Sequence, residues 1–458
     1  MGFRINTGSG IDPKLVDKLM ELEYQPVKMI ENRVKGVEEE QKEFNELKGL
    51  ISKFGTALTG FRTQGDFFKV KLDSSHPDII DGSVDNRTPI GTYELQVLKL
   101  AKTHKMLAES FPDKNETPVG FGLMAIEIED EGVVEIEVDP DSNTLLEVAN
   151  AINSAKAGVK AVIINTKENI EHLDEENYRL LVISEKSGKQ GKVWIDPDTT
   201  MLDFNEQVSG RNLEMLFEDV PVYNEDNNVT ELIEGLTLNA KKAAPGTVVT
   251  ISTDYDIDET LGNIQELINA YNDVNNFLQD QFTVDPKTNR AGILSKDNSL
   301  KTLRRNLQSA LQCVHEGGKY RTLADIGITT DAKTGALNFD ESKAREALAD
   351  DYLSVSQLFV QSEDFDGVGV RLTNTVRDLQ SADHGILSSK DREYRKILAS
   401  FENDIATKER LAEQRAAGIK RKFAAVESLI SGLNTQGQFL AQKLGMGAQG
   451  SNQQNKSS

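Results

Sequence analysis

The first sixty residues of the chain have apolar positions at helical spacing. Asp12 followed by Pro13 is a typical helix start, because Asp caps free N–H groups and Pro at the first helical position needs no hydrogen bond. Pro26 then predicts a break or kink. The apolar positions recur every three or four residues, at Leu15, Leu19, Leu22, Val27, Ile30 and Val34. This period predicts helices on both sides of Pro26, with a heptad-like apolar seam.

A second seam of the same period lies near the other end of the chain. Its apolar positions are Leu398, Phe401, Ile405, Ile419, Val426 and Leu433. Lys408, Arg415 and Lys422 interrupt it with cationic side chains. Charged seam positions cost stability unless a partner satisfies them, so we expect this helix to pack loosely alone and to tighten on assembly. Packing on the chain's own core is an equally compatible interpretation of both seams.

Between the two helical ends the period changes to that of short strands bounded by turn residues. Strands are predicted at 79–84, 91–97, 124–128, 133–138, 159–164, 178–184, 193–195, 220–223, 236–239 and 247–252. One helix interrupts them at 144–157. The polar loop between Pro112 and Pro118 indicates a boundary, and the strands before and after the following segment most economically form one domain into which it is inserted.

The predicted fold class is therefore α+β and multidomain, with a nested order. Terminal coiled-coil-like leg helices are expected at 1–43 and 390–458, where the last ten residues form a polar tail that we expect to be disordered. A helical-bundle domain is expected from both chain ends, at 44–70 and 256–389. Two β-rich central domains follow inside it, one at 71–116 and 202–255 and an inserted acidic α+β lobe at 117–201.

Composition and charge narrow the function classes. The chain has 458 residues, one cysteine and a formal net charge of −22. An acidic balance argues against nucleic acid or an anionic membrane as the main partner. No run of about 18 apolar residues occurs, so no membrane insertion is expected. The single cysteine excludes an internal disulfide framework, and the first dozen residues lack the apolar stretch of a cleavable secretory signal.

Candidate chemistry is sparse. The five histidines are far apart in the sequence, and no nucleophile elbow, phosphate-binding loop or dinucleotide fingerprint occurs. The pairs Asp139 with Asp141 and Asp196 with Asp198 could serve a carbohydrate-active enzyme, but Pro between two acids is more typical of a turn. Cys313 lies on a predicted helix and is interpreted as a buried apolar residue. The sequence therefore predicts a non-enzymatic protein without a catalytic, metal or cofactor site.

Four groups of residues resemble one family, the flagellar filament cap or hook-associated protein 2 family, and they occur in the family's order across nearly the whole chain. They are 8–27, 91–101, 233–254 and a last group that includes 270–272, 292–294, 326–328 and 335–340. The chain departs from the family's usual pattern at 65–68. The inserted lobe matches mainly at 145–152 and 178–184, so its surface chemistry does not carry over.

The resemblance implies a secreted, non-enzymatic assembly factor of the bacterial flagellum. It would leave the cell unfolded through the flagellar export apparatus, form a homo-oligomeric ring at the distal filament tip, promote flagellin insertion and prevent flagellin loss. Its implied partners are further copies of itself, flagellin, hook–filament junction proteins and an export chaperone at the C-terminal helix. The alternatives are another flagellar axial or surface structural protein or an adhesin, and the inserted lobe could serve adhesion.

Overall fold

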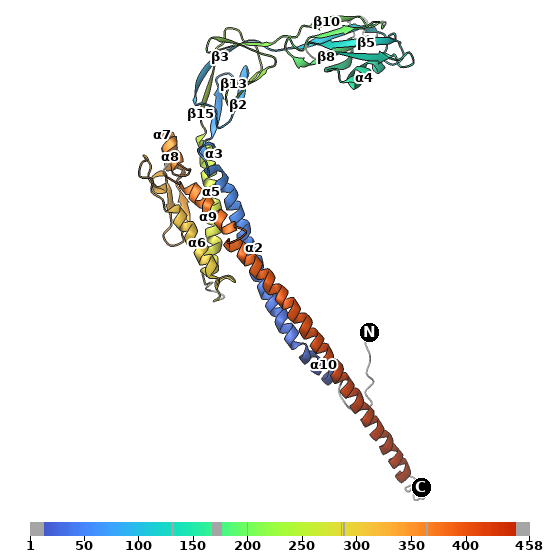
Figure 1. The fold of residues 1–458 in the computed structure, drawn as a ribbon, viewed down its shortest axis with the longest axis vertical. Helices are drawn as coiled ribbons and strands as arrows, with labels where there is room; N and C mark the ends of the chain where they lie inside the picture. The colour runs from blue at the N-terminus through green and yellow to red at the C-terminus, as the bar shows by residue number, and fades with distance from the viewer. Residues whose placement is uncertain are drawn as a thin grey trace, which may run out of the picture.

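The computed structural model describes residues 13–445 except 130–131, 167–175, 199, 285, 287–288 and 363–364. The molecule is elongated, with long helices at one end and β-sheets at the other (Figure 1). Helix α1 spans Pro13–Glu23, α2 spans Gln25–Ala57, and α10 spans Ile386–Gly445. Tyr24 separates the first two, where Pro26 falls in the first turn of α2. Both α2 and α10 run unbroken through the boundaries predicted at 43/44 and 389/390, so leg and helical domain share continuous helices.

The helical domain assembles around α2 and the start of α10. It adds α5 (Ile257–Phe282), α6 (Asn298–Leu311), α7 (Glu341–Asp350), α8 (Tyr352–Gln357), α9 (Val368–Gln380) and the small hairpin β16 (Ile328–Thr330) with β17 (Leu337–Phe339). Asp256, Asp297, Asp340 and Asp351 cap α5, α6, α7 and α8, each accepting a backbone N–H of the first turn. Fully buried aromatic side chains hold the centre, among them Phe44, Phe54, Phe61, Tyr271 and Phe359.

Next along the molecule is a β-rich domain of two antiparallel sheets. The larger has the order β1 (Val70–Ser74), β15 (Val249–Tyr255), β3 (Gly91–Lys99), β11 (Leu213–Phe217) and β12 (Val220–Asn224). The smaller has the order β13 (Asn228–Ile233), β14 (Leu236–Ala240) and β2 (Ile80–Val84). Inward positions of both sheets, such as Val97, Leu238 and Ile251, form one core.

The inserted lobe is a sandwich with its own core. One sheet has the order β10 (Phe204–Val208), β4 (Thr103–Phe111), β8 (Tyr178–Ser187) and β7 (Val159–Asn165). The other has the order β6 (Gly132–Val138), β5 (Gly122–Ile128) and β9 (Val193–Asp196), and α4 (Leu145–Ala155) packs on this core. Thr144 and Glu147 form a capping box at the start of α4.

The sheet pairing corrects the predicted limits of the lobe. The sequence predicts limits at 117 and 201, because the polar loop before Pro118 is typical of a domain boundary. Strand β4 pairs with β8, and β10 pairs with β4, so both belong to the lobe although they lie outside those limits. Ala108 and Leu202 are fully buried in the lobe core. The lobe therefore covers 103–208, and the α+β class with terminal helices and central sheets is confirmed.

Candidate assembly surface

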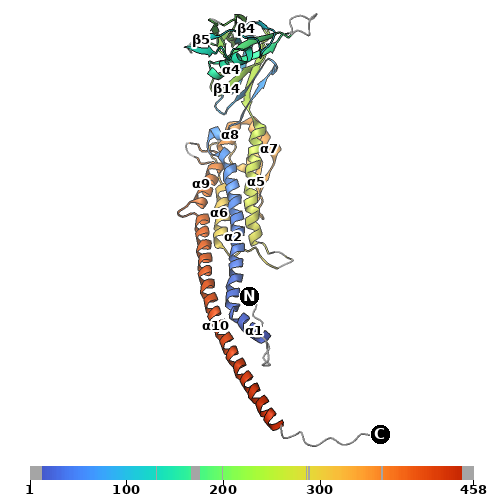
Figure 2. The same cartoon turned by 90° about the vertical axis from the view of Figure 1, so that its right-hand side faces the viewer.

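The two ends of the chain meet along the long helices. Helix α10 contacts both α1 and α2, and the helices lie side by side in both views (Figures 1 and 2). Where α1 and the start of α2 contact α10, Val16 and Val27 are only 5% and 4% exposed, and the small side chains Ala412 and Ala416 of α10 are also buried. Small residues on α10 allow α1 to approach closely, which explains why an otherwise polar stretch of α10 holds a short helix.

An ion pair satisfies one of the cationic seam positions. The Arg415 guanidinium lies 3.2 Å from a carboxylate oxygen of Glu23, the last residue of α1. Near the start of α10, Lys48 Nζ of α2 lies 2.6 Å from Asp391 Oδ2 and joins the two helices. Arg415 is therefore a contact between the two ends of the chain, where the sequence pattern showed only an interruption of the apolar seam.

The twelve predicted seam residues are mostly uncovered in a single chain. Val27 is buried, whereas Ile30, Val34, Leu398, Phe401, Ile405 and Ile419 are partly exposed. Leu19, Leu22, Val426 and Leu433 are exposed, and the side chain of Leu15 lies outside the described residues. The predicted assembly residues did not include Val16, Ala412 or Ala416, because alanine gives a weak periodic signal and Val16 lies off the spacing of Leu15, Leu19 and Leu22. The assembly role of the twelve stays a prediction.

Beyond Lys422 the character of α10 changes. Between Phe423 and Leu440 the single charged side chain is Glu427. Five large apolar side chains in this stretch are exposed, at Val426, Leu429, Leu433, Phe439 and Leu440. No described helix lies beside it, and α10 runs on alone past α1 (Figure 2). A helix with so few charges that presents large apolar side chains to water is typical of a binding surface. We refer to residues 423–440 as the free end of α10.

The opposite end of α10 is held firmly in the helical domain. The ring of Tyr394, 5% exposed, lies 5.7 Å from that of Phe44. Burial, together with nearby Glu40, raises the pKa of Tyr394 to about 12. Lys390 Nζ lies 3.0 Å from Asp297 Oδ2, which ties α10 to the cap of α6. The free end is thus an extension of a helix whose base is fixed.

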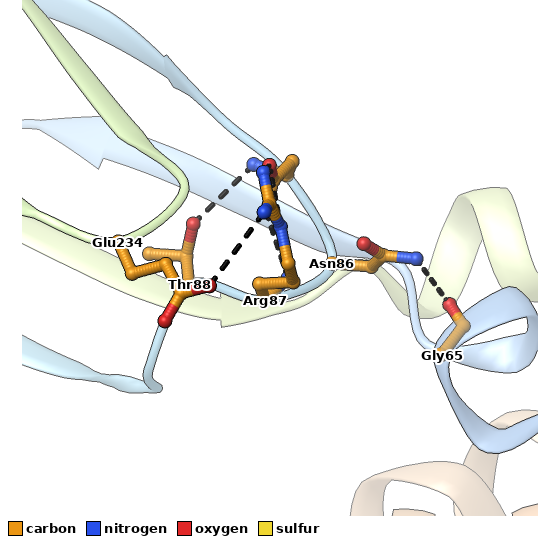
Figure 3. Close-up of polar contacts among 6 residues, drawn as sticks. Gly65, Asn86, Arg87, Thr88 and Glu234 are labelled. Carbon is orange, nitrogen blue, oxygen red and sulfur yellow. Dashed lines mark hydrogen bonds and ion pairs between the residues drawn. The ribbon is translucent and has the colours of Figure 1, made fainter. Parts of the chain in front are cut away.

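A second set of contacts joins the helical domain to the β-rich domain. In the loop after β2, Asn86 donates from Nδ2 to the carbonyl oxygen of Gly65, 2.5 Å away, and Arg87 lies 3.6 Å from Glu234 (Figure 3). Hydrogen bonding from Arg87 holds the pKa of Asp85 below its usual value. The loop therefore contacts both the short helix before β1 and the hairpin of β13 and β14.

The hairpin turn explains one of the sequence landmarks. Gly235 has a φ of +77°, and a Cβ there would lie 2.7 Å from Thr88 Oγ1. The Gly235 carbonyl accepts a hydrogen bond from the backbone N–H of Asp85, 2.9 Å away. Glycine is thus needed for both backbone conformation and space. The short helix α3 (Gln64–Phe67), which carries Gly65, overlaps the stretch 65–68 where the sequence departs from the family pattern.

The candidate catalytic groups take structural roles. Asp139 and Asp196 each accept the backbone N–H of the acid two residues later, at 2.8 and 3.1 Å, as in Asx turns. Burial raises the pKa of the Cys313 thiol, which is 8% exposed. Within the described residues, no three His, Cys, Asp or Glu side chains are grouped to hold a metal ion. Among these residues, no helix is both long and apolar enough to cross a bilayer.

Comparisons with known proteins agree on one family. Residues 9–104 match the model of the flagellar hook-associated protein 2 N-terminus, and residues 210–435 match that of its C-terminus. The B-type flagellar hook-associated protein 2 of Pseudomonas aeruginosa is 27% identical over 463 aligned residues, which cover 94% of each chain. The flagellar hook-associated protein 2 of Escherichia coli K12 is 24% identical and covers 96% of this chain.

The lobe explains the gap between the two family models. Residues 105–209, which neither model matches, are almost the whole lobe at 103–208. The fold is that of the crystal structure of the D1-D2-D3 domains of the flagellar cap protein FliD from Escherichia coli, with a TM-score of 0.63 over 76% of this chain and 98% of that one. Both ends of the chain match the family models, and the relatives cover nearly its full length, so this chain belongs to the flagellar hook-associated protein 2 family.

Proposed function

We propose that this protein caps the flagellar filament: several copies form a ring at the distal tip, where they promote flagellin insertion and prevent flagellin loss. The observation that supports the proposal most directly is the free end of α10, a long helix fixed at its base whose last turns present apolar side chains to water. A helix of this kind draws stability from packing against other helices. Family membership supports the filament tip as the place of that packing.

The proposed partners follow from the same geometry. The exposed seam residues of α1, α2 and α10 are the proposed contacts with flagellin and hook–filament junction proteins. Before assembly, the free end of α10 is also the proposed site of an export chaperone, because exposed apolar helices aggregate unless they are covered. The protein would reach the tip through the flagellar export apparatus. The proposed role is structural, with no catalytic step.

Complementation of a deletion strain tests this function. Loss of the gene from a motile host should give short or absent filaments and monomeric flagellin in the medium, and the wild-type gene should restore them. The variant Leu429→Glu with Leu433→Glu should fail to restore filaments, because it places two charges on the apolar row of the free end. Normal filaments in the deletion strain would disprove the proposal.

A matched control separates the apolar row from helix disruption. Asn434 and Gln438 lie on the opposite side of the same helix, at helical angles of about 140–180° from Leu429. The variant Asn434→Glu with Gln438→Glu adds the same charge to the same part of the helix and should still restore filaments. If both pairs of substitutions abolish filaments alike, the apolar row has no special role. The alternative function, a self-polymerising axial subunit, predicts long filaments of purified protein in electron micrographs, where a cap forms small closed rings.

A further inference from the structure

The lobe at 103–208 has two outer sheet faces with opposite charge, and we propose that they bind each other between neighbouring copies. The sheet β10-β4-β8-β7 of one copy would pack on the sheet β6-β5-β9 of the next. This inference rests on the proposed ring and names a contact within it. Neither family model covers most of the lobe, so the contact is argued from the residues of this chain.

The outer face of the four-stranded sheet is apolar with a cationic margin. Strands alternate sides, and Ala161, Leu180 and Val182 point into the lobe core. Their neighbours Val162, Ile164, Leu181 and Ile183 therefore point outward, are partly exposed, and belong to no core cluster. Lys105 on β4, Lys160 on β7 and Arg179 on β8 occupy outward positions of the same sheet, and Glu185 is the exposed carboxylate at the next outward position of β8, so the charge of these four residues is net positive. We refer to this surface as the cationic face.

The sequence itself marks this face as unusual. A sheet with one side in water shows regular alternation of apolar and polar residues, whereas near-continuous apolar strands are typical of sheets covered on both sides. Residues 161–164 and 180–183 are uninterrupted apolar runs, in the paired strands β7 and β8. One side of these strands is covered by the lobe core. The other has no described element over it, so a second copy is the proposed cover.

The outer face of the three-stranded sheet has the complementary charge. Met124, Ile126 and Ile136 point into the core, so the alternate positions point outward. Register places Glu135, Ala125 and Asp196 in one row across the sheet, and Val133, Glu127 and Trp194 in the next. Leu123 pairs with Glu137 in a third row. We refer to this surface as the acidic face.

Exposed apolar groups lie among these carboxylates. Val133, Leu123 and Trp194 are 57%, 48% and 41% exposed. Glu127, Glu135 and Glu137 form no ion pair with any other described residue. Lys192 adds a positive charge beside this face, with its ammonium 4.6 Å from the centroid of the Trp194 ring. The face thus presents large side chains for packing together with unpaired negative charge.

The two faces favour a head-to-tail contact. Two acidic faces would repel one another, and so would two cationic faces, whereas one of each brings Lys105, Lys160 and Arg179 toward the carboxylates. The faces point away from each other because the core separates the two sheets, so a lobe can contact one neighbour on each side. Such heterologous contacts form a ring when the rotation between neighbouring copies closes, as the proposed cap requires. The lobe lies at the far end of the molecule from the free end of α10, so both surfaces can bind at once (Figure 1).

Charge reversal in the full-length protein tests the contact. The variants are Lys105→Glu with Lys160→Glu on the cationic face, Glu135→Lys with Glu137→Lys on the acidic face, and a chain with all four substitutions. Analytical ultracentrifugation gives the protein concentration at which rings dissociate, and electron microscopy shows the rings. Each double variant should raise that concentration about tenfold or more, since attraction becomes repulsion at two positions. The four-substitution chain should return to near the wild-type value.

A control variant and a salt series test whether the effect belongs to the two charged faces. Lys156→Glu with Lys189→Glu changes two exposed lysines outside both faces and should leave the dissociation concentration unchanged. Wild-type rings should weaken as salt is raised, because about 1 M salt shortens the screening length to about 3 Å. The face-to-face contact is wrong if wild-type rings form but either double variant assembles normally. It is also wrong if the four-substitution chain dissociates at as high a concentration as the double variants. In both cases the proposed ring itself still stands. If the wild type forms no rings, the proposed function fails as well.

Discussion

The rings of Tyr255 and Tyr352 are stacked with centroids 4.0 Å apart and an interplanar angle of 3°. Tyr255 ends the last strand of the β-rich domain, and Tyr352 begins α8 in the helical domain. The Tyr352 hydroxyl also lies 2.6 Å from Thr260 Oγ1 and donates to the carbonyl oxygen of Phe67, 3.3 Å away. One side chain therefore contacts both chain segments that cross between the two domains, and it sets how the β-rich half is held on the helices.

Loss of this side chain should destabilise the junction strongly. Tyr352→Ala removes a buried aromatic ring, 4% exposed, and should lower the free energy of unfolding by about 3–5 kcal/mol. Tyr352→Phe keeps the ring but removes the hydroxyl that contacts Thr260 Oγ1, the Lys69 N–H and the Phe67 carbonyl, which should cost about 1–2 kcal/mol. Urea unfolding followed by circular dichroism measures both. Tyr223→Phe, at a side chain that is 66% exposed, should change nothing, and equal effects of all three would contradict this account.

The hairpin turn at Gly235 should tolerate no side chain. Gly235→Ala combines a φ of +77° with a Cβ 2.7 Å from Thr88 Oγ1, so the loop after β2 must move. We expect a loss of about 2–3 kcal/mol in the free energy of unfolding of the β-rich domain. Gly246→Ala is the matched control, since its φ is +87° but nothing lies within 4 Å of the added Cβ. It should cost about 1 kcal/mol, and a cost equal to that of Gly235→Ala would exclude the close packing as the cause.

The order of the elements was readable from the sequence, because hydrophobic period is set locally. Helices at both ends, strands between and a nested insertion all follow from spacing and turn residues. The limits of the lobe could not be predicted from the sequence, because a polar loop such as 112–118 occurs within domains as well as between them. Only the pairing of β4 with β8, far away in sequence, shows that β4 belongs to the lobe.

The helices that carry the candidate assembly surface were predictable from the sequence, because their apolar period is also set locally. Seam spacing predicted the leg helices, and the exposed residues Leu429 and Leu440 continue the same spacing. What spacing could not show is which seam residues the chain covers itself. Ala412 and Ala416 are buried because α1 packs on them, and this depends on the break at Tyr24. The partner of Arg415 is Glu23, nearly the whole chain away in sequence, so no local pattern could have predicted it.

The helical domain should lose stability in alkaline solution. Burial raises the pKa of Tyr271 to about 12, whereas an unfolded tyrosine titrates near 10. Below about pH 10 both states keep the proton and stability is constant. From about pH 10 to 12 the unfolded state loses its proton while the folded state retains it, so the free energy of unfolding falls, by up to about 3 kcal/mol for this residue.

Comparison of chemical denaturation at pH 9 and pH 11.5 measures that loss. Tyr271→Phe removes the titrating group and should reduce the pH-dependent part, although it lowers stability at pH 9 by the loss of the hydrogen bond to the Gly335 carbonyl, 3.2 Å long. Tyr223→Phe removes an exposed hydroxyl and should leave the alkaline loss as in the wild type. An unchanged pH dependence in Tyr271→Phe would show that other groups cause it.

The contact between the two ends of the chain should depend on the small side chains of α10. Ala412, 2% exposed, lies where α1 packs, so Ala412→Glu would place a charge in a contact that has no room for it. We expect α1 to detach while α10 and the helical domain stay folded, because Phe44 and Tyr394 hold the base of α10 independently. Hydrogen exchange at 13–23 should then speed up, with little change at 257–282. Ala424→Glu, at an exposed position of the free end, is the matched control. If exchange at 13–23 is the same in both variants, α1 is held by other contacts, of which the Glu23–Arg415 ion pair is the first to examine by charge reversal.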